Sequence, residues 1–507
     1  MIKHNSLSFS GVEYLYPSSA QAVIKNVSFD VRTTWTGIVG ENGAGKTTLL
    51  LLAAGILKPS AGVCKRPESV FYCPQRTDEL PPGWEDFFAS IYNDNDVGAL
   101  YSRLGIENDW PLRWGSLSHG ERKRLQLAIA LARKSELLAI DEPTNHLDRV
   151  AKRLIGDALA EYTGIGLLVS HDRALLDRLC TDCLFLENGN AVLRPGGVTH
   201  GLKEEKREQL ENSRIQEQLH HERNRLSVEA DRRRHLADSA RSRLSKKHLG
   251  TKDSDAKAKI NLARLSGKDA VGTNLYKHMV HRIDRVDQTL NAGHSEGKRK
   301  TGVTLEGAAS KADRLFLLEA GSLPIGNNRT LFFPELGMAK RMRVALTGKN
   351  GAGKSMLVRH IIEHISPSIH FFYLPQELTE AESRAVLAQT FEENEKSRGR
   401  ILSYFSRLGS NPKNILQSAQ PSPGEVRKLL IARAVNHNPA LIIMDEPTNH
   451  LDLPAVILLE GMLKECCCAL LLVSHDEAFL SALTETEWTI SSRTPYSFIL
   501  NFVVNEK

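Results

Sequence analysis

The chain lacks several features that membrane and secreted proteins need. Its longest apolar runs, such as CCCALLLV at 466–473, fall far short of the ~18 residues that a membrane-spanning helix requires. The N-terminal stretch MIKHNSLSFSGVEYLYP has no apolar segment of the signal-peptide type. The seven cysteines follow no regular framework, which is typical of the reducing cytoplasm. These absences predict a cytoplasmic protein without a membrane span.

Two groups of cysteines are interpreted as structural. Cys180 and Cys183 form a CxxC pair, but no second pair or histidine cluster lies near them in the sequence. A half-buried thiol pair is therefore favoured over a zinc or redox site. The run of cysteines at 466–468 opens an apolar stretch and is predicted to belong to a strand.

The middle of the chain, about 200–310, lacks proline and contains one aromatic residue, Tyr276. Such a segment cannot build its own core, but it is rich in good helix formers. A first helix is predicted over 202–249, with a length of roughly 70 Å. Apolar residues at helical spacing predict a second, amphipathic helix, and 250–274 is interpreted as the turn between two antiparallel helices. The second helix is marked by Leu275, Met279, Ile283, Val286 and Leu290.

This middle segment also carries the positive charge of the protein. Residues 201–300 have a net charge of +9, whereas the rest of the chain has a net charge of −3. A localised excess of this kind indicates contact with a polyanion, although a solvated spacer helix without a partner is equally compatible with it. The candidate RNA-binding residues around the turn are Lys246, Lys247, Lys252, Lys257, Lys259, Arg264 and Lys268.

The sequence is internally duplicated. Five motifs occur twice, in the same order and 301 to 308 residues apart. They are GENGAGKT at 40–47 and GKNGAGKS at 348–355, PQ at 74–75 and 375–376, LSHGE at 117–121 and PSPGE at 421–425, DEPTNHLD at 141–148 and 445–452, and SHD at 170–172 and 474–476. This arrangement predicts two copies of one domain.

Each copy opens with a glycine loop between an apolar run and a helix-forming run. The pattern G-x-x-x-x-G-K-[ST] lets backbone N–H groups cradle phosphates at a helix N-terminus. Lys46 and Lys354 are expected to reach the outer phosphates, and Thr47 and Ser355 to hold Mg²⁺. The nucleotide-binding residues predicted from the two loops are Gly40, Asn42, Gly43, Gly45, Lys46, Thr47 and Thr48, and Gly348, Asn350, Gly351, Gly353, Lys354 and Ser355.

An apolar run in each copy, LLAIDE or LIIMDE, delivers two acidic residues at its end. Asp141 and Asp445 are expected to orient the magnesium shell, directly or through water. Glu142 and Glu446 are expected to act as general bases that polarise the attacking water. Two surface acids after a strand are the alternative, which the preceding phosphate loops disfavour.

Together these motifs resemble the ATP-binding cassette superfamily. Two cassettes in one chain, with DEPTNHLD in both, are similar to the ABC-F family, and the resemblance covers nearly the whole chain. It implies an α/β fold of two P-loop ATP-binding cassette domains joined by a long two-helix antiparallel hairpin linker. The domains implied are 1–199, 200–310 and 311–507. The stretch SDAKAKINLARLSGKD at 254–269 is similar to the tip of the family's interdomain linker.

The resemblance also implies that the two cassettes of a monomer pair head to tail around two ATP molecules. Each site would combine the phosphate loop of one copy with the signature of the other, so that Ser422 and Gly424 face Lys46 while Ser118 and Gly120 face Lys354. His171 and His475 would contact the γ-phosphate and join the two glutamates as catalytic residues. The implied metal-site residues are Thr47, Gln75, Asp141, Ser355, Gln376 and Asp445.

Three departures from the family pattern affect these expectations. His119 replaces a glycine in the first signature, and the second signature contains Pro421 and Pro423. Because proline lacks an N–H, the site built from Lys46 and the second signature is expected to be the slower one. Tyr16 fits the aromatic residue that stacks on adenine, although an ordinary surface tyrosine is nearly as compatible. The second copy has Leu323 and Pro324 at the matching distance, so no adenine-stacking residue is predicted there.

Family members are ribosome-associated ATPases. The resemblance therefore implies hydrolysis of ATP to ADP and phosphate with Mg²⁺, and a linker tip that contacts large-subunit rRNA and the P-site tRNA. Only 42 residues separate Gln75 from Ser118, and 32 residues follow His475, so neither a large inserted arm nor a long tail is present. This is most similar to the antibiotic-resistance branch, whose members protect the ribosome; rescue of stalled ribosomes is the related role. A fused ATPase subunit of a membrane transporter and a DNA-acting ATPase are the alternatives.

Overall fold

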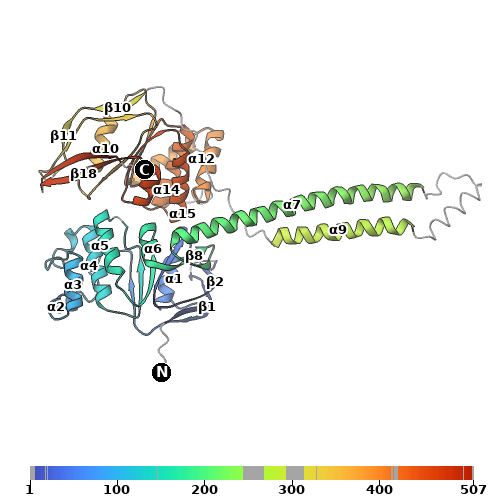
Figure 1. Ribbon diagram of the computed structural model, residues 1–507, viewed down its shortest axis with the longest axis horizontal. Coiled ribbons are helices and arrows are strands. Elements are labelled where there is room, and N and C mark those ends of the chain that lie inside the picture. Colours follow the sequence, from blue (N-terminus) through green and yellow to red (C-terminus); the bar gives the residue numbers. More distant parts are fainter. Residues whose placement is uncertain are drawn as a thin grey trace, which may run out of the picture. The chain divides into compact units, whose positions relative to one another are not determined.

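The computed structural model describes residues 6–17, 19, 21–145, 147–243, 268–292, 313–326, 328–412, 415, 421–494 and 496–504 (Figure 1). The chain divides into two compact units. One unit comprises Met1–Gly201 and Arg299–Lys507, and the other comprises Leu202–Lys298.

The first copy is built on a six-stranded sheet with strand order β5-β6-β7-β3-β8-β9. Its first five strands run parallel, and β9 pairs antiparallel with β8. A three-stranded antiparallel sheet of order β2-β1-β4 accompanies it. The strands are β1 (Leu7–Tyr14), β2 (Ile24–Val31), β3 (Trp35–Gly40), β4 (Ala61–Lys65), β5 (Val70–Cys73), β6 (Leu137–Asp141), β7 (Ile165–Val169), β8 (Cys180–Glu187) and β9 (Asn190–Pro195).

The second copy repeats this order. Its eight-stranded sheet reads β11-β12-β19-β18-β14-β17-β16-β15, so β15 to β19 and β14 stand where β5 to β9 and β3 stand in the first copy. The strands β12 and β11 extend one edge, and β10 pairs with β13 separately. The strands are β10 (Arg314–Leu318), β11 (Gly321–Pro324), β12 (Thr330–Phe333), β13 (Leu336–Ala339), β14 (Arg343–Gly348), β15 (Phe371–Leu374), β16 (Leu441–Asp445), β17 (Ala469–Val473), β18 (Thr486–Thr494) and β19 (Ser497–Val504).

Helices cover these sheets and exclude water from the parallel strands. Every residue of β6, β7, β16 and β17 is buried, as expected of parallel strands that are covered on both faces. In the first copy the helices are α1 (Lys46–Ala53), α2 (Trp84–Ser90), α3 (Asn95–Arg103), a 3₁₀ turn (Trp114–Ser116), α4 (His119–Ala132), α5 (Arg149–Leu159) and α6 (Arg173–Leu179). In the second copy they are α10 (Lys354–Glu363), α11 (Glu380–Glu392), α12 (Glu395–Arg407), α14 (Pro423–His437), α15 (Leu453–Glu465) and α16 (Glu477–Leu483).

The cysteines at 466–468 do not belong to a strand, contrary to the prediction. Cys466 caps α15, and β17 begins after Cys468, at Ala469. Cys466 and Cys468 form a disulfide. Cys180 and Cys183 are free thiols, and both are buried rather than half-buried as predicted.

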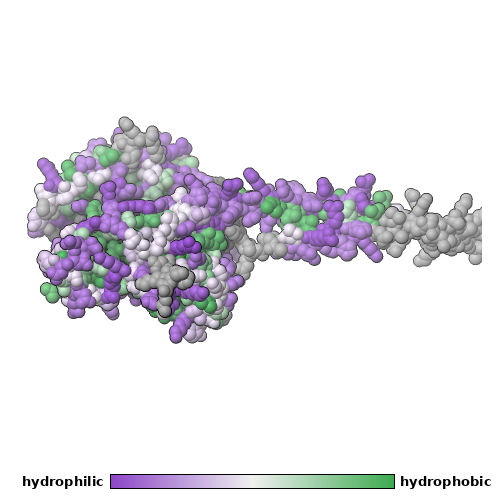
Figure 2. All heavy atoms as spheres, turned by 60° about the horizontal axis from the view of Figure 1, so that its bottom comes forward, coloured by the Kyte–Doolittle hydropathy of each residue, from purple (hydrophilic) through white to green (hydrophobic). Residues whose placement is uncertain are grey.

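The other unit contains a helical hairpin of α7 (Val198–Arg243) and α9 (Lys268–Ala292). The two helices lie side by side and run in opposite directions (Figure 1), which confirms an antiparallel pair, and ion pairs of Arg223 with Asp287 and of Arg282 with Glu222 join them. The second helix begins at Lys268, inside the stretch predicted to be the turn. The other six candidate RNA-binding residues lie outside the described residues. Figure 2 shows a mainly hydrophilic hairpin surface with hydrophobic patches, and no described helix has the length and apolar character that a bilayer crossing requires.

Candidate active sites

The two phosphate loops join a central strand to a helix, as predicted. In the first copy β3 ends at Gly40 and α1 begins at Lys46; in the second copy β14 ends at Gly348 and α10 begins at Lys354. The residue before each helix is a glycine in the left-handed region, with φ of 98° at Gly45 and 94° at Gly353. A Cβ at Gly45 would lie 2.8 Å from Val23 Cγ1, so both backbone angle and space require glycine there.

Neither helix N-terminus is capped by a side chain. The first N–H groups of α1 and α10 therefore face the loop without a side-chain acceptor, which suits a phosphate. Of the other predicted residues, Asn42, Gly43, Asn350 and Gly351 lie in the two loops, whereas Thr47, Thr48 and Ser355 lie in the first turn of α1 or α10.

The loop lysines are held by their own loops. Lys46 Nζ donates to the carbonyl oxygens of Gly40 at 2.8 Å and Glu41 at 3.0 Å, and Lys354 makes the equivalent bonds. Burial lowers the pKa of both lysines, against the opposing effect of nearby carboxylates. An anion placed on the loop would replace these carbonyl contacts with a stronger, charge-assisted one.

The first acidic residue of each pair contacts the hydroxyl that follows the loop lysine. Thr47 Oγ1 donates to Asp141 Oδ2 at 2.8 Å, and Ser355 hydrogen-bonds to Asp445 in the same way. Burial raises the pKa of both aspartates. Asp445 Oδ2 is buried and has no hydrogen-bond partner. A hydroxyl beside a buried carboxylate oxygen is a hard donor set that fits Mg²⁺.

Gln376 lines the same cavity as Ser355 and Asp445. Gln75 and Gln376 follow the edge strands β5 and β15, and both are exposed. Buried cations donate to the backbone of the two segments that contain Gln75 and Gln376. Lys123 Nζ donates to the carbonyl oxygen of Pro74 at 2.8 Å, and Arg427 donates to that of Gln376 at 2.8 Å. Sequence reasoning missed both cations; the signal available was a basic residue two positions after each GE, but neighbouring basic residues (Arg122, Arg124 and Lys428) obscure it.

The second acidic residue of each pair adopts an unusual backbone conformation. Glu142 has φ of 45° and Glu446 has φ of 49°, values rare for residues other than glycine. The backbone N–H of Glu142 donates to the carbonyl oxygen of Val169, and that of Glu446 donates to the carbonyl oxygen of Val473. Each valine is the last strand residue before the SHD motif. Burial raises the pKa of Glu142 to about 8 and that of Glu446 to about 7, although the loop lysines oppose the shift. A carboxylate with a pKa near neutrality has the proton affinity expected of a general base.

The SHD histidines lie against these glutamates. His171 Nε2 is 3.0 Å from Glu142 Oε1, and His475 Nε2 is 3.5 Å from Glu446 Oε1. The backbone N–H of each histidine also donates to the glutamate at 3.3 Å. Burial, reinforced by the loop lysines, lowers the pKa of both imidazoles to about 3, so both are neutral at pH 7.

The side chains that lie beside the two phosphate loops differ between the copies. The hydroxyl of Tyr16 is 3.0 Å from Thr48 Oγ1 on α1, so this tyrosine lies over the first turn after the phosphate loop. In the second copy the hairpin between β11 and β12 supplies Ile325 and Arg329 instead. Arg329 Nη1 is 3.6 Å from where a Gly351 Cβ would be. Sequence reasoning missed Arg329, because its distance from the loop along the chain differs from that of Tyr16.

Both signatures begin a helix. Ser118 caps α4 and Ser422 caps α14, each in a capping box completed by the signature glutamate. Pro423 occupies the first turn of α14, where an N–H would have no partner within the helix, so the proline does not destabilise the helix. It does remove one hydrogen-bond donor from the N-terminus of the helix. His119 keeps that N–H, and its Nδ1 lies 3.2 Å from Thr77 Oγ1.

The first phosphate loop contacts the second copy directly. The backbone N–H of Asn42 donates to Asp452 Oδ2 at 2.9 Å, and its side-chain amide donates to the carbonyl oxygen of His450 at 3.2 Å. A Cβ at Gly424 would lie 3.9 Å from Asn42 Nδ2, so the second signature reaches this loop. Gly120 makes no equivalent contact: among the described residues, only the Leu147 side chain comes within 4 Å of its Cβ position.

The second phosphate loop borders a cavity of about 390 Å³ between the copies. Its lining includes Lys354, Glu446 and His475 from the second copy and Asn145 and Lys152 from the first. Lys152 Nζ donates to the carbonyl oxygen of His475 at 3.4 Å. Residues that follow DE in each copy therefore contact the other copy or line the cavity beside it; position 146 lies outside the described residues.

The comparisons agree with this geometry. The family model described as ABC transporter matches residues 24–145 and 334–449. The ribosome protection protein VmlR of Bacillus subtilis (strain 168) is 28% identical over 94% of this chain and 85% of its own. The tylosin resistance ATP-binding protein TlrC of Streptomyces fradiae is 30% identical over 95% of this chain and 96% of its own. A solved structure of an archaeal ribosome recycling factor, in complex with an archaeal ribosomal stalk protein, shares the fold, with a TM-score of 0.63 and 16% identity over 97% of this chain and 89% of its own.

Proposed function

Because this chain belongs to the ABC-F family of tandem ATP-binding cassette proteins, we propose that it is a cytoplasmic translation factor that binds the ribosome. It is an ATPase, and the proposed role of ATP hydrolysis is to determine how long the protein remains bound to the ribosome. Protection from an antibiotic is the biological role that the names of its relatives favour. The single observation that carries the proposal is similarity along nearly the full length of a ribosome protection protein.

The proposed chemistry is the same in both copies. Lys46 and Lys354 bind the outer phosphates of ATP, and Glu142 and Glu446 each accept a proton from an attacking water. His171 and His475, neutral and hydrogen-bonded to those glutamates, orient them and contact the γ-phosphate. Mg²⁺, when bound, neutralises phosphate charge. Its proposed protein contacts are Thr47, Gln75, Asp141, Ser355, Gln376 and Asp445.

Pairing of the copies within one chain is proposed to close the sites. Ser422 and Gly424 complete the site of Lys46, and Ser118 and Gly120 complete the site of Lys354. The contacts of Asn42 with the second copy support the first half of this arrangement. A monomer is therefore sufficient for hydrolysis, with cassettes at 1–199 and 311–507.

The linker, 200–310, is proposed to carry the RNA contacts. Positive charge is concentrated there, and the proposed partners are large-subunit rRNA and the P-site tRNA. The residues proposed for this contact are Lys246, Lys247, Lys252, Lys257, Lys259, Arg264 and Lys268.

Density-gradient sedimentation tests the proposal. The variant Glu142→Gln/Glu446→Gln with MgATP is expected to travel with ribosomes, and digestion with RNase is expected to release it. A fused transporter ATPase would instead follow the membrane fraction, and a DNA-acting ATPase would remain on nucleic acid after RNase treatment. Either of those outcomes would refute a ribosomal role.

A further inference from the structure

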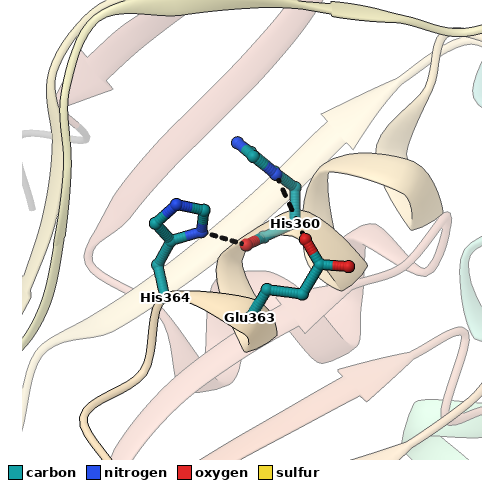
Figure 3. Close-up of side chains that lie close together, drawn as sticks. All are labelled: His360, Glu363 and His364. Carbon is teal, nitrogen blue, oxygen red and sulfur yellow. Dashed lines mark hydrogen bonds and ion pairs between the residues drawn. The ribbon is translucent and has the colours of Figure 1, made fainter.

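Three potential metal ligands lie at the C-terminal end of α10. His360 and Glu363 belong to its last turn, and His364 is the residue that caps it. All three come from the stretch HIIEH at 360–364, which sequence analysis did not single out. Figure 3 shows the two imidazoles and the carboxylate grouped around the end of the helix.

The ligand atoms of these side chains are already close. One ligand atom from each lies within 4.8 Å of the others, a convergence that no other trio of His, Cys, Asp and Glu reaches among the described residues. His360 Nδ1 is 3.6 Å from Glu363 Oε2. Tetrahedral ligands at about 2.1 Å from a metal ion are separated by roughly 3.4 Å. Small side-chain rotations on the solvent face therefore suffice to bind an ion.

One imidazole is oriented for metal binding by a hydrogen bond. His364 Nδ1 lies 2.9 Å from the carbonyl oxygen of His360. A carbonyl oxygen can only accept, so Nδ1 carries the proton and Nε2 keeps its lone pair free. Metal-binding histidines in proteins are commonly held by such a bond from the other ring nitrogen. The Phe333 ring on β12 lies near the His360 ring, with a distance of 6.1 Å between the ring centroids.

The position on the helix also favours a cation. The C-terminal end of an α-helix carries partial negative charge, which attracts positive ions. The site is open, because the side chain of Glu363 is 71% exposed and that of His360 is 27% exposed. Lys354 begins this ten-residue helix, about 9 Å before His360 and about 15 Å before His364 along the helix axis. The cluster is thus separate from the phosphate loop.

We propose that His360, Glu363 and His364 bind one Zn²⁺ ion, with water completing its coordination. Two imidazole nitrogens and one carboxylate oxygen suit zinc, whereas Mg²⁺ and Ca²⁺ prefer oxygen ligands. The bound ion links the last turn of α10 to the residue that caps it. It takes no part in ATP hydrolysis.

Zinc binding to the full-length protein tests this assignment. Metal-stripped protein in excess Mg²⁺, without nucleotide, is titrated with Zn²⁺ in competition with a chromogenic chelator. Wild type is expected to bind one more Zn²⁺ than His360→Gln/His364→Gln, and Glu363→Gln is expected to bind it at least about tenfold more weakly. The matched control is His278→Gln/His281→Gln, which removes two exposed histidines from one face of α9 and is expected to bind like wild type.

Spectra of Co²⁺-loaded protein report the ligands directly. Wild type is expected to show a visible d–d band that the His360→Gln/His364→Gln variant lacks, and Zn²⁺ is expected to raise the melting temperature of wild type only. If the double variant does not fold, the single variant His364→Gln, which changes an exposed residue, replaces it. Equal zinc stoichiometry and affinity in wild type and the histidine variant would overturn the proposal.

Discussion

Asn42 in the first phosphate loop donates its backbone N–H to Asp452 at 2.9 Å, across 410 residues of sequence. The same carboxylate accepts from Lys428 Nζ at 3.3 Å and, through Oδ1, from the N–H of Ala455 at 2.9 Å. Burial alone would raise the pKa of Asp452, but the Lys428 charge and these hydrogen bonds hold it below its ordinary value. One buried carboxylate thus joins a helix cap, a buried cation and the other copy's phosphate loop.

Asp452→Asn is therefore expected to destabilise the protein and slow ATP turnover. The amide keeps one oxygen for the cap, but its nitrogen cannot accept from Asn42 or Lys428. A buried ion pair that loses one partner costs about 3–5 kcal/mol. Thermal unfolding and steady-state ATPase assays measure both effects.

Asp148→Asn is the matched control for that substitution. Asp148 caps α5 by accepting the backbone N–H of Ala151 at 2.9 Å, a hydrogen bond within its own copy. If Asp148→Asn lowered the stability and the ATPase rate as much as Asp452→Asn does, a special role for the contact with Asn42 would be contradicted.

Glu142→Gln/Glu446→Gln is expected to bind MgATP normally and to lose nearly all turnover. Loss of a general base typically costs ~10²–10⁴-fold in rate. Single-turnover hydrolysis and equilibrium binding of labelled ATP separate the two effects. Glu465→Gln, at an exposed glutamate that ends α15, is the control; a double variant that hydrolyses at the wild-type rate would refute the assignment.

The two sites are expected to contribute unequally. Glu446→Gln should slow turnover more than Glu142→Gln, because the Glu142 site is completed by the signature in which Pro423 lacks an N–H donor. The steady-state rates of the two single variants, measured side by side, test this. Equal rates, or a slower Glu142→Gln variant, would show that the proline does not limit its site.

Removing the buried carboxylate of Glu142 should stabilise the metal-free, nucleotide-free protein. Glu142 has a pKa of about 8 when folded, raised by burial from the ordinary 4.5. The stability that its neutral form contributes is fully present below pH 4.5 and is lost as pH rises through 8, by up to about 1.4 kcal/mol per pH unit. The melting temperature of Glu142→Gln should therefore exceed that of wild type by a margin that grows from pH 5 to pH 8. A margin that is constant with pH would contradict the prediction.

Replacing the seven basic residues around the linker turn with Gln should weaken ribosome binding and flatten its salt dependence. Each lost phosphate contact lowers the slope of log affinity against log salt by just under about 1. The residues are Lys246, Lys247, Lys252, Lys257, Lys259, Arg264 and Lys268, of which only the last lies in a described element. Sedimentation at several salt concentrations measures the slope.

The basal ATPase rate of that variant should stay unchanged, because the catalytic residues lie in the cassettes. Lys58→Gln/Lys65→Gln, at exposed lysines of the first cassette, is the control for loss of charge. Unchanged ribosome binding and salt slope after the seven replacements would support a solvated spacer instead.

The sequence by itself determined the phosphate loops, the acidic strand ends and the repeat of one domain, because each depends on neighbouring residues. Gly45 before a helix and Ser118 at a helix start are set by local backbone angles and capping bonds. The tertiary structure alone decided which distant groups meet. Asn42 and Asp452 touch only after both copies have folded, and Arg329 reaches the second loop through the geometry of a hairpin. The buried cations Lys123 and Arg427 look like surface residues in the sequence, since charged side chains are buried only where packing supplies carbonyl partners.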